Sequence, residues 1–156
     1  MSNDALEYLM GGAPTLTFPD LGTVHKGRIR SYEKTQQRDM DSGMPKVWEN
    51  GEPMWQIVFT LETEERDSEI DSDDGVRRLF AKAQMLTAIR DVIRKSGHRG
   101  EVRGGVLAVK YAADGQAKTR GYNPPKVYAA RFEPPVPTDD FDDVGEQGDD
   151  EGEEFF

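Results

Sequence analysis

The stretch VRRLFAKAQMLTAIRDVIRKSG, residues 76–97, decides how the rest of the chain is interpreted. Its second part spaces apolar residues so that they form one stripe on a helix, namely Met85, Leu86, Ile89, Val92 and Ile93. Gly97 suits the position just after a helix end, so the spacing predicts a helix over 83–96. The first part follows Asp74-Gly75, a hairpin signal, and predicts a strand over 76–82.

Four further segments show the composition and alternation of β-strands. They are residues 23–34, 54–61, 106–112 and 126–132. Gly27 inside the first strand indicates a bulge or a sharp bend. In the second strand, a period of two places Trp55 and Phe59 on one apolar face, so we expect both in the core. We also expect core positions for the aromatic residues Phe80, Tyr111 and Phe132.

The resulting order is three strands, a helix and two strands. This order matches the five-stranded OB-fold barrel, a mainly β fold that binds oligonucleotides on one face and on its loops. We expect an N-terminal arm over residues 1–20, the barrel domain over 21–136, and a disordered acidic tail over 137–156.

The net charge of −10 is distributed unevenly along the chain. Residues 137–156 contain ten acidic residues and no Lys or Arg, whereas the preceding residues are neutral in sum. Within that body, residues 62–74 have a net charge of −7 and the remainder a net charge of +7. The pattern therefore predicts a mildly basic scaffold with one acidic loop and an acidic tail. With no Cys, no signal-peptide pattern and no long apolar run, we expect a protein of the cytoplasm.

Motifs that support catalysis or metal binding are absent from the sequence. There is no Gly-Lys-Ser/Thr dipeptide and no Gly-x-Ser-x-Gly elbow, and His25 and His98 are not at metal-ligand spacing. Asp71-Ser-Asp73-Asp74-Gly75 resembles the start of a calcium loop, but Lys82 stands where that loop needs Glu. We expect neither an enzyme nor a cofactor. A metal-assisted nuclease using Asp71, Asp73 and Asp74 is the weakest of the alternatives.

Basic residues interleave with aromatic residues on several predicted strands. Cations follow the phosphates of a single strand and aromatic rings stack its bases, so this pattern favours binding of single-stranded nucleic acid. The residues expected to neutralise phosphates are Arg28, Arg30, Lys34, Lys46, Arg77, Arg78 and Lys126. The residues expected to stack bases are Tyr32, Trp48 and Tyr122.

The acidic tail ends in Glu153-Glu154-Phe155-Phe156. Two terminal aromatic rings reduce solubility, and acidic residues beside them suit a peptide that enters an apolar pocket with a basic rim. The tail is therefore predicted to bind partner proteins. It can also fold back onto the basic groove of its own chain, where its high effective concentration lets a weak contact compete with DNA.

These features together resemble a phage single-stranded-DNA-binding protein of the OB-fold type. The resemblance rests on the Phe-terminated acidic tail and on residues 53–61, 75–86 and 121–128. It implies that the protein protects single-stranded DNA during phage DNA replication and recombination in the host bacterial cytoplasm, while the tail recruits replication and recombination proteins. The tail lacks the Pro-Phe ending of the bacterial proteins, so the partner pocket can differ.

An alternative class is a protein-interaction adaptor or acidic decoy. In that case the tail and the acidic loop imitate nucleic acid for a basic partner, and the chain itself does not bind DNA. Strand edges and the N-terminal arm could also pair subunits, and the sequence does not distinguish a dimer from a tetramer.

Overall fold

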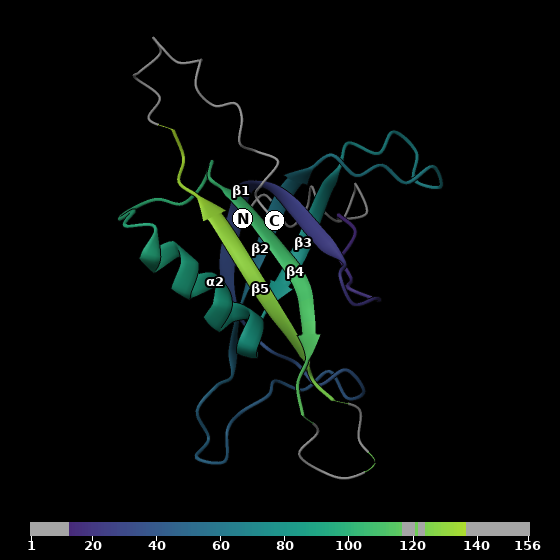
Figure 1. The fold of residues 1–156 in the computed structure, drawn as a ribbon. Helices are drawn as coiled ribbons and strands as arrows, with labels where there is room; N and C mark the ends of the chain where they lie inside the picture. Colours follow the sequence, from purple (N-terminus) through teal and green to yellow (C-terminus); the bar gives the residue numbers. More distant parts are fainter. Residues whose placement is uncertain (1–12, 117–120, 122–123, 137–156) are drawn as a thin grey trace.

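Strands make up most of the structure, a computed structural model that describes residues 13–116, 121 and 124–136. Residues 1–12, Tyr122 and the tail 137–156 lie outside the described residues. The described elements follow in the order β1 (Val24–Gln36), β2 (Trp55–Thr63), β3 (Val76–Ala81), α2 (Ala83–Lys95), β4 (Val106–Asp114) and β5 (Lys126–Glu133) (Figure 1). The predicted five strands, with a helix between the third and the fourth, are confirmed.

The strands form one antiparallel sheet in the order β3-β2-β1-β4-β5. Within the described residues no ladder joins β3 to β5, so the sheet is open. The closed barrel that the strand order predicts would need such a ladder. The structure therefore shows a mainly β fold with one curved sheet and, among the described residues, a single helix of 13 residues.

The central strand β1 pairs with both halves of the sheet. Residues 24–28 pair with β4 and residues 27–36 pair with β2, so the two ladders overlap at Gly27 and Arg28. A β-carbon at Gly27 would lie 2.8 Å from the carbonyl oxygen of Glu62, closer than side chains approach backbone in proteins. The absence of a side chain at Gly27 thus lets the backbone of β2 approach β1 closely. The register shift between Ile29 and Ser31 follows two residues later in β1.

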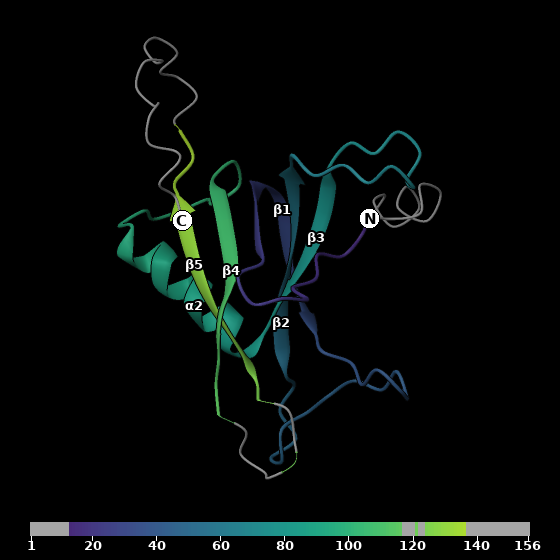
Figure 2. The same cartoon turned by 45° about the vertical axis from the view of Figure 1, so that its right-hand side comes forward.

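The apolar stripe of α2 packs mainly against β5 and touches β2 only slightly (Figures 1 and 2). Met85 and Ile89 are buried, in agreement with the predicted stripe. The core also contains Phe59 and Tyr111, as expected from the sequence. No helix in the described ranges is long and apolar enough to cross a membrane.

The predictions for Trp55 and Phe80 have a different outcome, whereas the prediction for Phe132 is confirmed in part. Trp55 is 45% exposed, so its placement in the core was wrong. Phe80 is half-buried on the face of β3 opposite Leu79 and Ala81, because its position alternates with theirs. Phe132 is half-buried and packs against the core.

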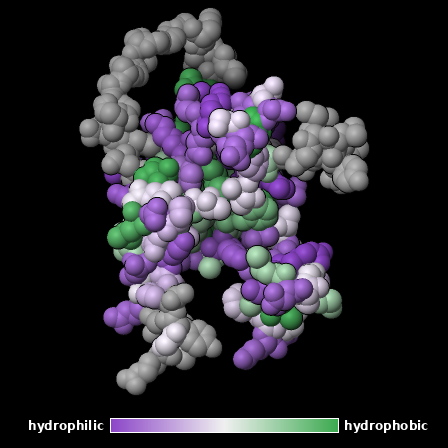
Figure 3. Space-filling model, turned by 90° about the vertical axis from the view of Figure 1, so that its right-hand side faces the viewer, coloured by the Kyte–Doolittle hydropathy of each residue, from purple (hydrophilic) through white to green (hydrophobic). Residues whose placement is uncertain are grey.

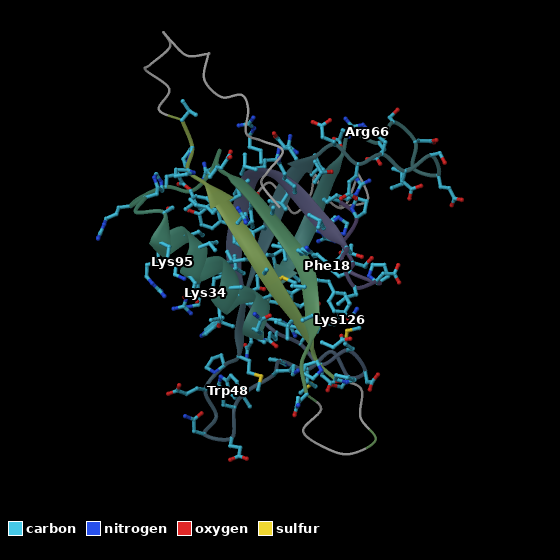
Figure 4. All side chains as sticks on the ribbon, in the orientation of Figure 1. Phe18, Lys34, Trp48, Arg66, Lys95 and Lys126 are labelled. Carbon is cyan, nitrogen blue, oxygen red and sulfur yellow. The ribbon has the colours of Figure 1, made fainter. Side chains whose placement is uncertain are left out.

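An N-terminal segment, residues 13–18, joins the two outer strands of the sheet. The amide of Leu16 donates to the carbonyl of Arg78 in β3 at 2.8 Å, and the amide of Arg78 donates to Pro14 at 2.8 Å. On the other side, Lys126 of β5 donates from Nζ to the carbonyl oxygen of Phe18 at 2.6 Å. In Figure 2 this purple segment crosses the space between β3 and β4/β5, and Figure 4 shows Phe18 beside Lys126.

The same segment completes the core. Leu16 and Phe18 are both buried, and the Phe18 ring meets Tyr128 edge-on with centroids 5.2 Å apart. Of the predicted arm over residues 1–20, the part from Ala13 onward is thus packed onto the sheet.

This packing predicts a large effect for a single substitution in the N-terminal segment. We expect Phe18→Ala to lower the free energy of unfolding by about 3–5 kcal/mol, because it empties a buried aromatic position. Thr17→Ala, an exposed neighbour, should stay within about 0.5 kcal/mol of the original chain. Chemical denaturation measures both, and equal stabilities of the two variants would contradict the assignment of Phe18 to the core.

Candidate nucleic-acid interface

The acidic loop and the loop that contains Lys46 and Trp48 lie at opposite ends of β2. Residues 64–75 connect β2 to β3 at one end, and residues 37–53 connect β1 to β2 at the other. Figure 4 shows this separation through Arg66 in the acidic loop and Trp48 in the opposite loop. Figure 3 views the molecule from the right-hand side of Figure 1, and this face is largely hydrophilic with paler residues near its middle.

The acidic loop is organised around a buried ion pair. Arg77 donates from both terminal nitrogens to Asp73, at 2.9 and 2.7 Å, and each side chain is only 6% exposed. The Arg77 guanidinium, together with the backbone amides of Gly75 and Asp67, holds the pKa of Asp73 well below its usual range. Arg77 was predicted to bind phosphate, and its guanidinium is used inside the protein, so our interface does not include it.

A second contact ties the acidic loop to the N-terminal segment. His25 Nδ1 lies 2.5 Å from Glu65 Oε2, and Nε2 lies 2.6 Å from the carbonyl oxygen of Thr17. Within the described ranges, no three His, Asp or Glu side chains are grouped so that they could hold a metal ion. The acidic loop is therefore built from internal contacts, including the Asp73 carboxylate that the nuclease alternative would need.

Three predicted cations gather on the face of the sheet that points away from the core. Arg28 donates to the carbonyl oxygen of Gly104 at 3.3 Å, and Arg30 lies 3.4 Å from Glu62. Arg78 donates from Nε to the carbonyl oxygen of Ala13 at 3.0 Å and covers the Phe80 ring. Each guanidinium already has a partner in the protein, and the ring that Arg78 covers, Phe80, is half-buried.

A second group of aromatic and basic side chains lies where β1 and β2 extend past α2. Trp55 starts β2, and the Lys34 ammonium lies 4.4 Å from the centre of its indole ring. Tyr32, two positions before Lys34, is 39% exposed. These three side chains border a groove of about 450 Å³ whose apolar lining comes from both the sheet and the helix, namely Ile57, Phe59, Leu86, Ile89, Ile93 and Val102.

Trp55 is the residue that the sequence interpretation missed. Its alternation with Ile57 and Phe59 correctly places it on the core side of β2. However, α2 packs mainly against β5, so the first residue of β2 extends beyond the cover that the helix provides. Arg90 of α2 also borders the groove, although a helix surface is the ordinary place for such a cation.

A hydrogen bond fixes Tyr32 at the groove. Its hydroxyl donates to Glu101 Oε2 at 2.7 Å. This bond, with burial, raises the pKa of Tyr32, and the same bond, with the Arg103 amide, lowers the pKa of Glu101. Both shifts favour the neutral phenol and the charged carboxylate, so the ring is held in place throughout the neutral pH range.

The loop over residues 37–53 presents Lys46 and Trp48 beside the groove. It is closed by short bridges that pair Arg38 with Pro45 and Val47 with Pro53. Gln36, which pairs with Trp55, also donates to the carbonyl oxygen of Lys46 at 2.9 Å, so the base of the loop adjoins the groove. The Trp48 side chain is 56% exposed.

The remaining predicted residues do not join this grouping. The Lys126 ammonium contacts the Phe18 carbonyl and lies 4.9 Å from the centre of the Tyr111 ring, so it links β5 to the N-terminal segment. Tyr122 and the tail residues Glu153, Glu154, Phe155 and Phe156 lie outside the described residues. The structure thus brings together Tyr32 and Lys34 of the predicted set, adds Trp55 and Arg90, and places Lys46 and Trp48 on the loop whose base adjoins the groove.

Comparisons with known proteins do not identify a relative. No protein-family model, no curated protein and no solved structure matches the chain. The functional argument therefore rests on the residues themselves.

The buried ion pair predicts how stability depends on pH. The pKa of Asp73 is lower in the folded chain than in the unfolded chain, so its contribution is present at neutral pH and declines as pH falls below about 4. We expect Asp73→Asn to lower Tm by several degrees at pH 7, and the difference from the original chain should shrink on acidification.

Thermal unfolding between neutral and acidic pH measures this dependence. Asp71→Asn serves as the control, since Asp71 is an exposed carboxylate of the same loop. A constant Tm difference for Asp73→Asn across the whole range would contradict the pairing.

Proposed function

We propose that the protein binds single-stranded DNA with little sequence preference and performs no chemical reaction on it. The observation that carries this proposal is the exposed Trp55 ring at the mouth of an apolar groove, with the Lys34 ammonium 4.4 Å from the ring centre. Trp48 and Lys46 repeat the same pair of residue types on the adjoining loop. Bases stack on such rings while cations approach the phosphates, and neither contact depends on which base is present.

The arrangement of the strands supports an OB-type fold for this function. A three-stranded meander, a helix and two further strands, with the first strand paired to the fourth, is the order expected of that barrel. In our proposal, the N-terminal segment completes the barrel by filling the gap between β3 and β5. The β1–β2 loop then lies where an OB-fold offers a surface to a single strand, and the groove adjoins the base of that loop.

The tail and the cellular role complete the proposal. The acidic, Phe-terminated tail recruits replication and recombination proteins by placing its rings in an apolar pocket with a basic rim. The protein thereby protects single-stranded DNA during phage replication or recombination in the bacterial cytoplasm. These roles follow from the resemblance stated above and from the chemistry of the tail.

Fluorescence anisotropy with labelled oligo-dT tests the binding function. We expect binding of the single strand in preference to a duplex of equal length, and the logarithm of the binding constant should fall with the logarithm of salt by about 0.7 per phosphate contact. Absence of binding at low salt would contradict the proposal and favour the adaptor or decoy alternative.

The Trp55 ring provides a specific test of the groove. Trp55→Ala should weaken oligo-dT binding by about 1–3 kcal/mol, because one stacking contact is lost. Trp55→Phe retains an aromatic face and should recover most of that loss, whereas Trp55→Leu should not. Equal affinities for the Phe and Leu variants would show that the ring does not stack a base.

Removal of the tail tests its competition with DNA. Deleting residues 137–156 removes ten negative charges that can reach the basic groove, so we expect tighter oligo-dT binding, most clearly at low salt. A titration of the truncated and full-length chains at two salt concentrations measures the change. Weaker binding after truncation would contradict the competition.

A further inference from the structure

A second hollow lies on α2 next to the groove. It measures about 480 Å³ and is bordered by residues of the helix end and of the loop that follows, namely Arg90, Ile93, Arg94, Gly97, His98 and Arg99. Arg90 and Ile93 also border the groove that contains Trp55. The two hollows therefore adjoin each other on the surface of α2 and share a wall formed by Arg90 and Ile93.

The charge around the second hollow is strongly positive. The last turns of α2 and the loop before β4 contain five cations, namely Arg90, Arg94, Lys95, Arg99 and Arg103, against the two acids Asp91 and Glu101. Arg94 pairs with Asp91 at 2.6 Å, and Arg103 lies 3.7 Å from Glu101. Arg90 and Arg99 have no acidic partner among the described residues.

The positions of these cations suit a polyanion that enters from the groove. Figure 4 shows Lys34 and Lys95 on the same side of the molecule along α2. Ile93 borders both hollows and provides an apolar surface between them, and His98 lines the second hollow. An extended backbone with regularly spaced negative charges can therefore pass from Trp55 over Arg90 to Arg94 and Arg99.

We propose that a single nucleic-acid strand continues from the Trp55 groove across helix α2, where Arg94 and Arg99 bind its phosphates in the second hollow. The inference rests on the proposed function and specifies the path of the strand. It places the added phosphate contacts on the helix instead of on the outer face of the sheet, because the second hollow shares Arg90 and Ile93 with the groove, whereas Arg28 and Arg30 border neither of these two hollows. Phosphate contacts of this kind add affinity without sequence preference.

The acidic tail is a competing occupant of the same hollow. Pro135 lies beside Gly104, so the described chain ends near the loop that forms this hollow. The nucleic-acid strand is favoured as the occupant because the second hollow adjoins the groove, whose border already includes the rings of Tyr32 and Trp55. Binding of the tail in this hollow would give a different result in the experiment below.

The test compares short and long oligo-dT on the full chain. OB-fold proteins cover roughly 4–16 nucleotides, so labelled strands of about 5 and about 16 nucleotides fill the groove alone or the whole path. Arg94→Gln/Arg99→Gln should bind the short strand like the original chain. For the long strand, it should lose affinity, and its salt slope should fall by about 0.7 for each removed contact.

A matched double variant controls for loss of positive charge. Arg28→Gln/Arg30→Gln removes the same charge from the outer face of the sheet and should bind both strands with unchanged affinity. Thermal unfolding of each variant verifies that the fold is retained. Circular dichroism at the binding temperature checks the helix itself, because Arg94 lies in its last turn.

Several results would overturn the inference. Equal affinity of Arg94→Gln/Arg99→Gln and the original chain for the long strand would exclude the path over α2, and a loss confined to the Arg28/Arg30 variant would place the path on the sheet. Tighter long-strand binding by Arg94→Gln/Arg99→Gln would show that these cations hold the tail. Failure of the original chain to bind either strand would overturn the proposed function, and the path with it.

Discussion

The double pairing of β1 is the constraint on which the rest of the structure depends. Because β1 pairs with β4 along residues 24–28 and with β2 along residues 27–36, it holds both halves of the sheet together. The overlap at Gly27 brings β2 within contact of a residue that has no side chain, and the register shift after Ile29 lets the strand bend. Without this double pairing, the strands β2 and β3 would form a sheet separate from that of β4 and β5.

The position of α2 creates the candidate interface. The helix lies against β5 and covers the middle of the core, but it leaves the ends of β1 and β2 open. Tyr32, Lys34 and Trp55 are on the core side of the sheet and yet reach solvent, because α2 packs mainly against β5. The N-terminal segment performs the complementary role on the other side, where Leu16 and Phe18 fill the gap between the outer strands.

Much of the fold could be predicted from local patterns, and the errors have identifiable physical causes. The alternation in β2 and the stripe in α2 correctly indicate which faces are apolar. Alternation shows which face of a strand is apolar, but it does not show how far along the strand the helix packs over that face. For this reason the alternation of Trp55 with Ile57 and Phe59 predicts a core position that the structure does not have. Arg77 shares the face of Leu79, so the same alternation indicates that Arg77 is buried. The pattern of basic and aromatic residues instead predicts that Arg77 binds phosphate, and this prediction is wrong. Leu16 and Phe18 also alternate, and Pro14 and Pro19 obscured that signal.

The most direct test of the central claim uses the intrinsic fluorescence of the protein. The chain has two tryptophans, Trp48 and Trp55, and the account places both at the nucleic-acid interface. The account predicts that saturating oligo-dT quenches emission in Trp48→Phe, in which Trp55 alone reports, and that added salt reverses the quenching. Unchanged Trp55 emission at a DNA concentration that saturates the anisotropy signal would contradict it, because the strand would then bind elsewhere on the molecule.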